Sequence, residues 1–451
     1  MLLSGTAALL LCSPARGELT PAFRVRVGDA PGPAPPVFGE GRAWLVDAAG
    51  SVHAVDTSGG RSVWQTSARC GQDALVFHEG VIACASGEHA RIAVVDAAEG
   101  KLVARETLDG GPYHVQAVDG VLLFHDLRSG RLLGYDVSRR TWTFDHRTEA
   151  DPPSDGRYAG LCLGSRYFFT EEEWRTLRAV DVADGRLHAV ARSATPVRID
   201  RGAWAEVTHG LILSRTARAA QAFDIARARR VWRFDAAEAT GVEGATIRAL
   251  RANGQQVLVL VDVADPSPAG TPAGTPAGTP AAAVAARWPL LVILDLRDGD
   301  VRAVRPLVPS LPAATMARFV LPQKDACAAA SVSDVLLVGE RPLAAVGASC
   351  SPRRARFPFG QVVGLAPVGG GREWTTPPGV GTALVATEDA VYALWGGEGI
   401  PHGERTVVEL DPATGAERVR AVVGYSASWA RIHGDQLWLG TSSGTVVVYR
   451  R

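Results

Sequence analysis

The chain has 451 residues, of which 47% are hydrophobic, 21% charged and 7% aromatic, and this composition is typical of a globular protein with a sizeable core. It excludes a disordered or collagen-like chain as the main architecture. The 47 Lys and Arg residues balance the 47 Asp and Glu residues, which argues against a protein whose main task is to bind nucleic acid or an anionic membrane.

The N-terminal residues resemble an export leader. Residues 2–12 form an apolar run of the size of a signal-peptide core, and this run is too short to span a bilayer. Residues 9–12 also resemble a bacterial lipobox, although Leu11 is larger than the residue usually found before the lipidated cysteine. We therefore expect residues 1–17 to be a signal peptide or a lipoprotein leader with Cys12 as the anchor, and we expect no transmembrane span in the mature chain.

A motif of the form Ala/Gly-x-Asp-x-x-x-Gly-x-x-x-Trp recurs along the chain. Shorter copies lack the tryptophan, and the recurring aspartates lie about 40 to 45 residues apart where no insertion intervenes. The copies that contain the tryptophan are residues 54–64 (Asp56, Gly60, Trp64), residues 222–232 (Asp224, Trp232, without the glycine) and residues 364–374 (Gly370, Trp374, without the aspartate).

Each copy of the motif is embedded in four short apolar runs separated by turn residues. Such runs predict strands, and four antiparallel strands per 40 to 45 residues is the arithmetic of a β-propeller blade. The Asp and Gly suit the turn after the third strand, because an Asp side chain can bond the backbone two residues on and Gly accepts positive φ. The Trp offers a large flat surface to a neighbouring blade. No helical periodicity follows residue 18.

Two insertions interrupt the repeats. Residues 265–281 repeat Gly-Thr-Pro-Ala, which predicts a flexible extended loop without a packing face. Residues 340–360 are interpreted as a second loop insertion. Its basic and aromatic residues could contact an anionic partner or a polysaccharide, and a solvated loop anchored by its rings is the simpler interpretation. These possible partner residues are Arg353, Arg354, Arg356, Phe357 and Phe359.

The two ends of the chain are expected to close the ring. The last unit, residues 428–451, lacks a fourth strand. Near the N-terminus, Phe23, Val25 and Val27 alternate with arginines, which is the period of a strand with one buried face. We predict that this segment completes the last blade. The motif count then gives eight full units and a ninth that is shared between the two ends, and the unit at residues 316–375 is the least regular of them.

The phased repeat resembles the PQQ-like, quinoprotein-type propeller repeat with its tryptophan-docking motif, over nearly all of residues 19–451. That family usually has eight blades, so the resemblance implies eight, whereas the motif count allows nine. The family includes quinoprotein alcohol dehydrogenases and cofactor-free propellers such as the outer-membrane assembly lipoprotein of the Bam complex. This chain looks more similar to the cofactor-free members.

The features of the dehydrogenases are not found in this sequence. Those enzymes hold a quinone between a Trp floor and a ring of adjacent cysteines, with an acidic base and Ca²⁺ ligands. Here no two cysteines are adjacent, and no set of Glu, Asn and Asp matches the family's calcium positions. The ten histidines are dispersed without an HExxH motif, and CxxC, GxSxG and P-loop motifs are missing. We expect no catalytic residues, cofactor or metal.

Cysteine spacing leaves the disulfide pattern open. Five cysteines follow Cys12: Cys70, Cys84, Cys162, Cys327 and Cys350. The local options are Cys70 with Cys84 and Cys327 with Cys350, and an odd count leaves at least one thiol unpaired. A turn at residues 79–80 would place Cys84 opposite residue 74 or 75 rather than Cys70, so the first pair is geometrically uncertain. Cys162 lies in an apolar run and is interpreted as a buried free thiol.

The sequence therefore predicts an all-β propeller that is exported, monomeric and non-catalytic. Its expected role is to bind a protein or cell-envelope partner, or to act as a scaffold, without binding nucleic acid. The alternative is an enzyme, either a PQQ-dependent or degenerate quinoprotein oxidoreductase or a propeller that acts on carbohydrate.

Overall fold

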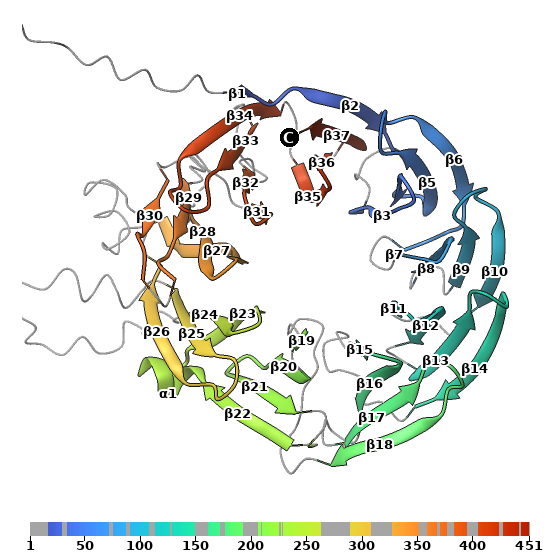
Figure 1. Ribbon diagram of the computed structural model, residues 1–451, viewed down its shortest axis with the longest axis horizontal. Helices are drawn as coiled ribbons and strands as arrows, with labels where there is room; N and C mark the ends of the chain where they lie inside the picture. Colours follow the sequence, from blue (N-terminus) through green and yellow to red (C-terminus); the bar gives the residue numbers. More distant parts are fainter. Residues whose placement is uncertain are drawn as a thin grey trace, which may run out of the picture.

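Nine antiparallel sheets form a ring in the computed structural model (Figure 1). The structure describes residues 17–28, 34–71, 75–86, 91–107, 113–126, 129–148, 161–171, 176–192, 206–208, 210–224, 227, 229–262, 289–307, 327–350, 359–367, 370–376, 383–394, 405–423, 427–441 and 443–450. All but the last residue of the expected leader (residues 1–17) and the whole Gly-Thr-Pro-Ala repeat lie outside these described residues.

The first four blades follow the chain without interruption. Each is a four-stranded meander whose first strand is nearest the centre of the ring and whose fourth is outermost (Figure 1). Their strands are β3 (Val37–Gly39), β4 (Arg42–Val46), β5 (Ser51–Asp56) and β6 (Ser62–Ser67) in blade 1; β7 (Leu75–His78), β8 (Val81–Ser86), β9 (Arg91–Asp96) and β10 (Leu102–Thr107) in blade 2; β11 (Tyr113–Val118), β12 (Val121–Asp126), β13 (Arg131–Asp136) and β14 (Thr141–Arg147) in blade 3; and β15 (Leu161–Leu163), β16 (Arg166–Glu171), β17 (Thr176–Asp181) and β18 (Leu187–Arg192) in blade 4.

The next four blades repeat this order. Their strands are β19 (Glu206–Thr208), β20 (Leu211–Arg215), β21 (Ala219–Asp224) and β22 (Arg229–Asp235) in blade 5; β23 (Thr246–Ala252), β24 (Gln256–Asp262), β25 (Leu290–Asp295) and β26 (Val301–Pro306) in blade 6; β27 (Cys327–Val338), β28 (Arg341–Cys350), β29 (Phe359–Gly364) and β30 (Trp374–Thr375) in blade 7; and β31 (Ala383–Ala386), β32 (Val391–Leu394), β33 (Arg405–Leu410) and β34 (Glu417–Val423) in blade 8.

Blade 9 closes the ring with both chain ends, as the sequence predicts. Its strands β35 (Ala427–His433), β36 (Gln436–Thr441) and β37 (Thr445–Arg450) are completed by β2 (Pro21–Arg26). The closing pair is antiparallel, with Phe23 opposite Val448 and Val25 opposite Val446. The chain reaches β2 from β1 (Gly17–Glu18), which pairs in parallel with the outer edge of blade 8, a pairing that the sequence does not signal.

Two predictions made from the sequence are wrong. Nine blades are present in the described part of the chain, not the eight implied by the family resemblance, because the irregular unit at residues 316–375 is a complete four-stranded blade. The second insertion is also misplaced. Residues 341–350 form β28, and β29 begins at Phe359, so most of residues 340–360 is strand.

Strand burial explains the sequence pattern. The second and third strands of a blade are covered by neighbouring blades on both sides, so they read as continuous apolar runs; all six residues of β8 are buried, for example. The outermost strands are half exposed and alternate, as β6 does. Eight hydrophobic clusters lie among the described residues, and each combines two consecutive blades. The core is therefore a series of inter-blade interfaces around the ring.

Helix is minimal in the described residues. The single helix α1 (Ala236–Thr240) joins blades 5 and 6, is capped by the Asp235 side chain and ends at Gly241, whose φ is 68°. Five residues are too few to give the helical periodicity that would reveal them in the sequence. Among the described residues, no helix is both long and apolar enough to cross a membrane.

Candidate functional site

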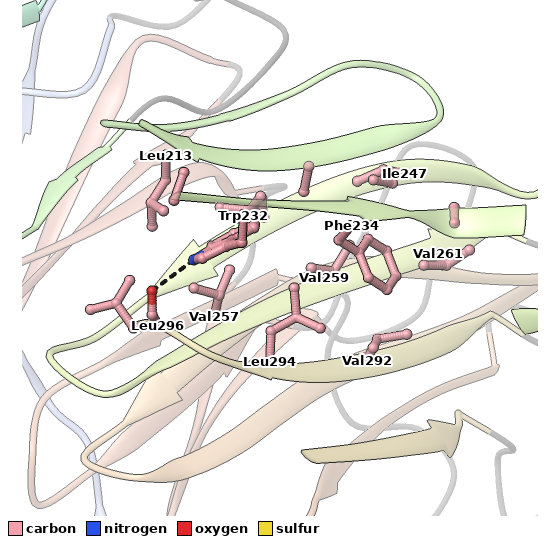
Figure 2. Packing of buried hydrophobic residues seen from close by; sticks show 14 of the residues in the cluster. Leu213, Trp232, Phe234, Ile247, Val257, Val259, Val261, Val292, Leu294 and Leu296 are labelled. Atoms are coloured by element: carbon pink, nitrogen blue, oxygen red, sulfur yellow. Dashed lines mark hydrogen bonds between the residues drawn. The ribbon is translucent and has the colours of Figure 1, made fainter. Parts of the chain in front are cut away.

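The recurring tryptophans dock on the following blade. The indole Nε1 of Trp64 in blade 1 donates a hydrogen bond to the carbonyl oxygen of Ala97 in blade 2, at 3.1 Å. Trp232 in blade 5 bonds Leu296 of blade 6 in the same way at 2.8 Å, as Figure 2 shows. Trp374 in blade 7 bonds Pro412 of blade 8 at 3.1 Å. Each acceptor directly follows the recurring aspartate of the next blade.

The glycine that receives each indole also belongs to the next blade. A Cβ atom added to Gly100 would lie 2.6 Å from the Trp64 ring. One added to Gly299 would lie 2.6 Å from the Trp232 ring. Both glycines also have positive φ, at 73° and 76°. The motif therefore works between blades, since the Asp-x-x-x-Gly turn of one blade is the surface on which the Trp of the preceding blade lies.

The docking position alternates between large and small residues around the ring. We define it as the eighth residue after the recurring aspartate. In blade 7, where Ala366 replaces the aspartate, we count from Ala366. In blade 9 the position is taken by Phe23, because Phe23 pairs with Val448 in the way that Trp64 pairs with Ala54 in blade 1. Odd-numbered blades carry an aromatic residue there and even-numbered blades a small aliphatic one. In blade order the residues are Trp64, Ala104, Phe144, Ala189, Trp232, Ala303, Trp374, Val419 and Phe23.

At several interfaces the residue before the aspartate of the next blade complements the docking residue in size. Trp232 packs in one cluster with Leu294 of blade 6. Where the docking residue is small, the facing residue is larger, because Ala104 packs in one cluster with Tyr135 of blade 3. Val419 likewise packs with Tyr449 of blade 9. The size of the facing residue does not alternate around the whole ring, because Ala303 packs in one cluster with Leu365 of blade 7 and Trp232 also meets a leucine.

The recurring aspartates hold their turns through backbone bonds. The Asp96 carboxylate accepts hydrogen bonds from the backbone N–H groups of Ala98 and Glu99, at 2.9 and 3.0 Å. The bond from Glu99 is the largest cause that lowers the pKa of Asp96 below its usual value. Asp295 behaves in the same way, because the N–H of Arg297 donates to it at 2.8 Å and lowers its pKa.

Several of these carboxylates are also ion-paired with a residue of an adjacent strand. Arg302 contacts Asp295 at 2.8 Å and Arg166 contacts Asp181 at 2.8 Å, and His188 lies 2.5 Å from Asp181. The bond from Arg166 is the largest cause of the lowered pKa of Asp181. Carboxylates with lowered pKa values that are engaged in turns stay ionised at neutral pH, which suits a structural role better than general acid catalysis. Among the described residues, no group of three or more His, Cys, Asp and Glu side chains could hold a metal ion.

The two faces of the ring differ in their connections. Turns from first to second strand and from third to fourth strand lie on one face, which we call the turn face. Links from second to third strand, and from each blade to the next, lie on the other, which we call the loop face. The longest inter-strand stretches of sequence, residues 263–289 between β24 and β25 and residues 307–326 between β26 and β27, both join strand ends on the loop face.

Aromatic residues in the connections segregate in the same way. In the sequence, the stretches that join strand ends on the turn face contain no Phe, Tyr or Trp, whereas those that join strand ends on the loop face contain eight, all outside the described residues: Tyr158, Trp174, Trp204, Trp288, Phe319, Phe357, Trp395 and Tyr425. Most of the sequence-predicted partner loop, Arg353 to Phe357, belongs to this set of connections but lies outside the described residues. Phe359 begins β29, where it pairs with Ala348.

The structure joins Cys70 and Cys84 by a disulfide, with Cα atoms 5.4 Å apart. The turn at residues 79–80 does place Cys84 opposite Leu75, as expected. Cys70 approaches from outside that strand pair, because it lies in the link between blades 1 and 2, where Gly71 N–H donates to Ala85 O at 3.0 Å. The register of one hairpin cannot predict contact with a residue such as Cys70 that lies outside the hairpin. Cys162 is a free thiol whose pKa burial raises to about 12.

The spacing of the repeats does not identify the inter-blade partners of the motif. One sequence feature does point to docking at other blades, because Phe144 and Phe23 stand where other blades have Trp. In the structure, Cβ atoms added to Gly185 and Gly60 would lie 2.5 and 2.2 Å from the rings of these two residues. Spacing within one repeat cannot reveal this, because the contact joins two repeats.

Comparison with known proteins agrees with the repeat type. Residues 30–141 match the family model described as outer membrane protein assembly factor BamB, so the resemblance to PQQ-like propeller repeats is confirmed. No curated protein sequence matches the chain.

Solved structures with similar architecture include three from different organisms. BamB from Moraxella catarrhalis has 11% identity, covering 96% of this chain and 100% of that chain with a TM-score of 0.49. Sqt1 from Saccharomyces cerevisiae has 12% identity, covering 84% and 95% with a TM-score of 0.49. Quinohemoprotein alcohol dehydrogenase from Comamonas testosteroni has 13% identity, covering 96% and 76% with a TM-score of 0.46.

Proposed function

We propose that this propeller is an exported, monomeric, non-catalytic binding protein that contacts a protein partner of the cell envelope through its loop face. The observation that carries the proposal is the segregation of aromatic residues, with eight in the loop-face connections and none in the turn-face connections. Aromatic side chains are enriched at the centres of protein interfaces, because they bury a large area at a small entropic cost. Turns built from Asp and Gly offer no such anchors.

Two further observations support the proposal. The recurring carboxylates are used to hold turns and to pair with arginine, as Asp295 is, so they are accounted for without a reaction. The Cys70–Cys84 disulfide fits a protein that matures in an oxidising compartment. Whether the leader is cleaved or carries a lipid on Cys12 does not change the binding proposal.

The test compares two triple variants of the full chain. One replaces loop-face anchors, Trp174→Ser, Trp204→Ser and Trp395→Ser. The matched control replaces exposed turn-face residues, Glu99→Ala, Arg186→Ala and Arg297→Ala. Partners that co-purify from the native host with the unchanged protein are identified by mass spectrometry, and their yield is then measured with each variant. Equal melting temperatures of the variants show that folding is intact.

We expect the loop-face variant to lose most of the partner and the control to keep it. If the partner stays on the loop-face variant and leaves the control, the turn face is the binding face and the proposal is wrong. A quinone that co-purifies and is reduced in the presence of an alcohol would instead support the oxidoreductase alternative.

A further inference from the structure

The β27–β28 hairpin of blade 7 is longer than its ring position needs. Its strands have 12 and 10 residues, whereas the innermost strands of the other eight blades have 3 to 7. The pairing of β28 with β29 ends at Ala348 opposite Phe359. Beyond that point, β28 pairs with β27 alone. A two-stranded ribbon without a third strand is marginally stable in water.

The open end of this ribbon is marked by a pair of cysteines. Cys327, the first residue of β27, lies opposite Cys350, the last residue of β28, and this pair is the final one in the register. Residues directly opposite in antiparallel strands have Cα atoms roughly 4.5 to 5.5 Å apart. That separation falls within the range of about 4.4 to 6.8 Å that a disulfide requires. The register therefore makes the two cysteines direct cross-strand partners, beside a register shift between Cys327 and Ala330, and a cross-strand pair of ordinary spacing is within reach of a disulfide.

We propose that Cys327 and Cys350 form a second disulfide, which fastens the ribbon where the chain enters and leaves it on the loop face. The two thiols lose two protons and two electrons and form the S–S bond. A small disulfide such as oxidised glutathione accepts them and leaves as two thiols. The existing Cys70–Cys84 bond belongs to the same oxidising chemistry.

The first experiment locates the bond. The full chain is equilibrated with oxidised and reduced glutathione, denatured and alkylated without reduction, digested and analysed by mass spectrometry. We expect one linked peptide pair containing Cys327 and Cys350, a second containing Cys70 and Cys84, and alkylated Cys162. If Cys327 and Cys350 are both alkylated while Cys70 and Cys84 remain linked, the proposal is overturned.

The second experiment measures what the bond does. The double variant Cys327→Ser with Cys350→Ser is compared with the unchanged protein by limited proteolysis, and Cys162→Ser is the matched control. We expect severalfold faster cleavage between residues 327 and 350 in the double variant, and an unchanged rate in the control. Addition of a reducing agent should raise the rate of the unchanged protein to that of the double variant. Equal cleavage of the oxidised protein and the double variant would show that the bond does not stabilise the ribbon.

Discussion

Replacement of Trp232 tests whether docking between blades holds the ring together. The side chain is 6% exposed, lies in the cluster shared by blades 5 and 6, and donates its N–H to Leu296 at 2.8 Å. Trp232→Ala leaves a cavity at this interface and an unpaired carbonyl, so we expect it to lower the free energy of unfolding by about 3 to 5 kcal/mol. Trp232→Phe keeps most of the apolar area and loses the hydrogen bond, for a loss of about 1 to 2 kcal/mol.

Replacement of Gly299, the glycine of blade 6 that contacts the Trp232 indole, tests the same interface from the neighbouring blade. Gly299→Ala puts a Cβ 2.6 Å from the Trp232 ring, at a φ of 76°, and we expect a cost of about 1 to 3 kcal/mol. Part of that cost comes from the clash with the ring. In a Trp232→Ala background the ring is gone, so Gly299→Ala should cost less, and the two changes should couple by about 1 kcal/mol or more.

Urea denaturation followed by far-UV circular dichroism measures these losses without relying on tryptophan fluorescence. Val231→Ala is the matched control, since Val231 is the preceding residue of β22 and is 38% exposed; its effect should stay within about 0.5 kcal/mol. If Trp232→Ala costs no more than Val231→Ala, or if Gly299→Ala costs the same in both backgrounds, the inter-blade docking argument is refuted.

Four other predictions follow from the ring and its turns. Removal of residues 18–28 should expose the edge of β37, lower the melting temperature sharply and cause aggregation in size-exclusion chromatography; a stable monomer would contradict closure by both ends. Removal of residues 269–280 should change the melting temperature by less than about 2 °C, and a larger fall would show that this tract packs. Added pyrroloquinoline quinone with Ca²⁺ should give neither tight binding in calorimetry nor alcohol-dependent dye reduction, whereas micromolar binding with turnover would favour the enzyme. The folded pKa values of Asp96 and Asp295 lie below the ordinary value of 3.8, so their contribution to stability is present above that value and is lost as pH falls through the folded pKa. Asp96→Asn should therefore reduce the loss of stability between pH 5 and pH 2 in urea titrations. An unchanged pH dependence would contradict the role assigned to the Asp96 turn.

The repeat could be predicted from sequence because its signals are local. A turn such as residues 96–100 needs an aspartate that bonds backbone N–H groups two and three residues on and a glycine with positive φ, and both fall within one short stretch. Strand closure was likewise visible, since Phe23, Val25 and Val27 alternate and the last unit lacked a strand. In both cases the residues that give the sequence signal are the same residues that form the turn or the strand.

The strands of blade 7 could not be predicted from the sequence, because their hydrophobic residues do not alternate regularly. β27 and β28 are rich in Ala and Ser, and their register shifts between Cys327 and Ala330 and again between Val332 and Asp334. A shift of register moves side chains to the opposite face of the strand, so alternation is lost. The motif count gives the correct number of nine blades, whereas the family resemblance implies eight.

The contacts of the candidate site were harder to predict because they join residues that are distant in sequence. Trp232 reaches Leu296, 64 residues away, across an intervening stretch that includes the Gly-Thr-Pro-Ala repeat. The disulfide of Cys70 with Cys84 depends on the path of the link between two blades rather than on strand register. The side of the ring to which a connection belongs also becomes clear only when every strand is assigned, and the loop face could not be distinguished before that.

The alternation of docking residues gives a reason for the place where the ring closes. With an even number of blades, aromatic and small docking residues could alternate without a break, but nine is odd, so two positions of the same kind must be neighbours, and here they are two aromatic ones. They are Phe23 in blade 9 and Trp64 in blade 1, and blade 1 therefore has an aromatic docking interface on both sides. One of these two interfaces contains β2, the strand supplied by the other end of the chain. Closure costs loop entropy because it joins distant parts of the chain, and the two aromatic interfaces flanking blade 1 supply large buried contacts at the junction where that cost must be offset.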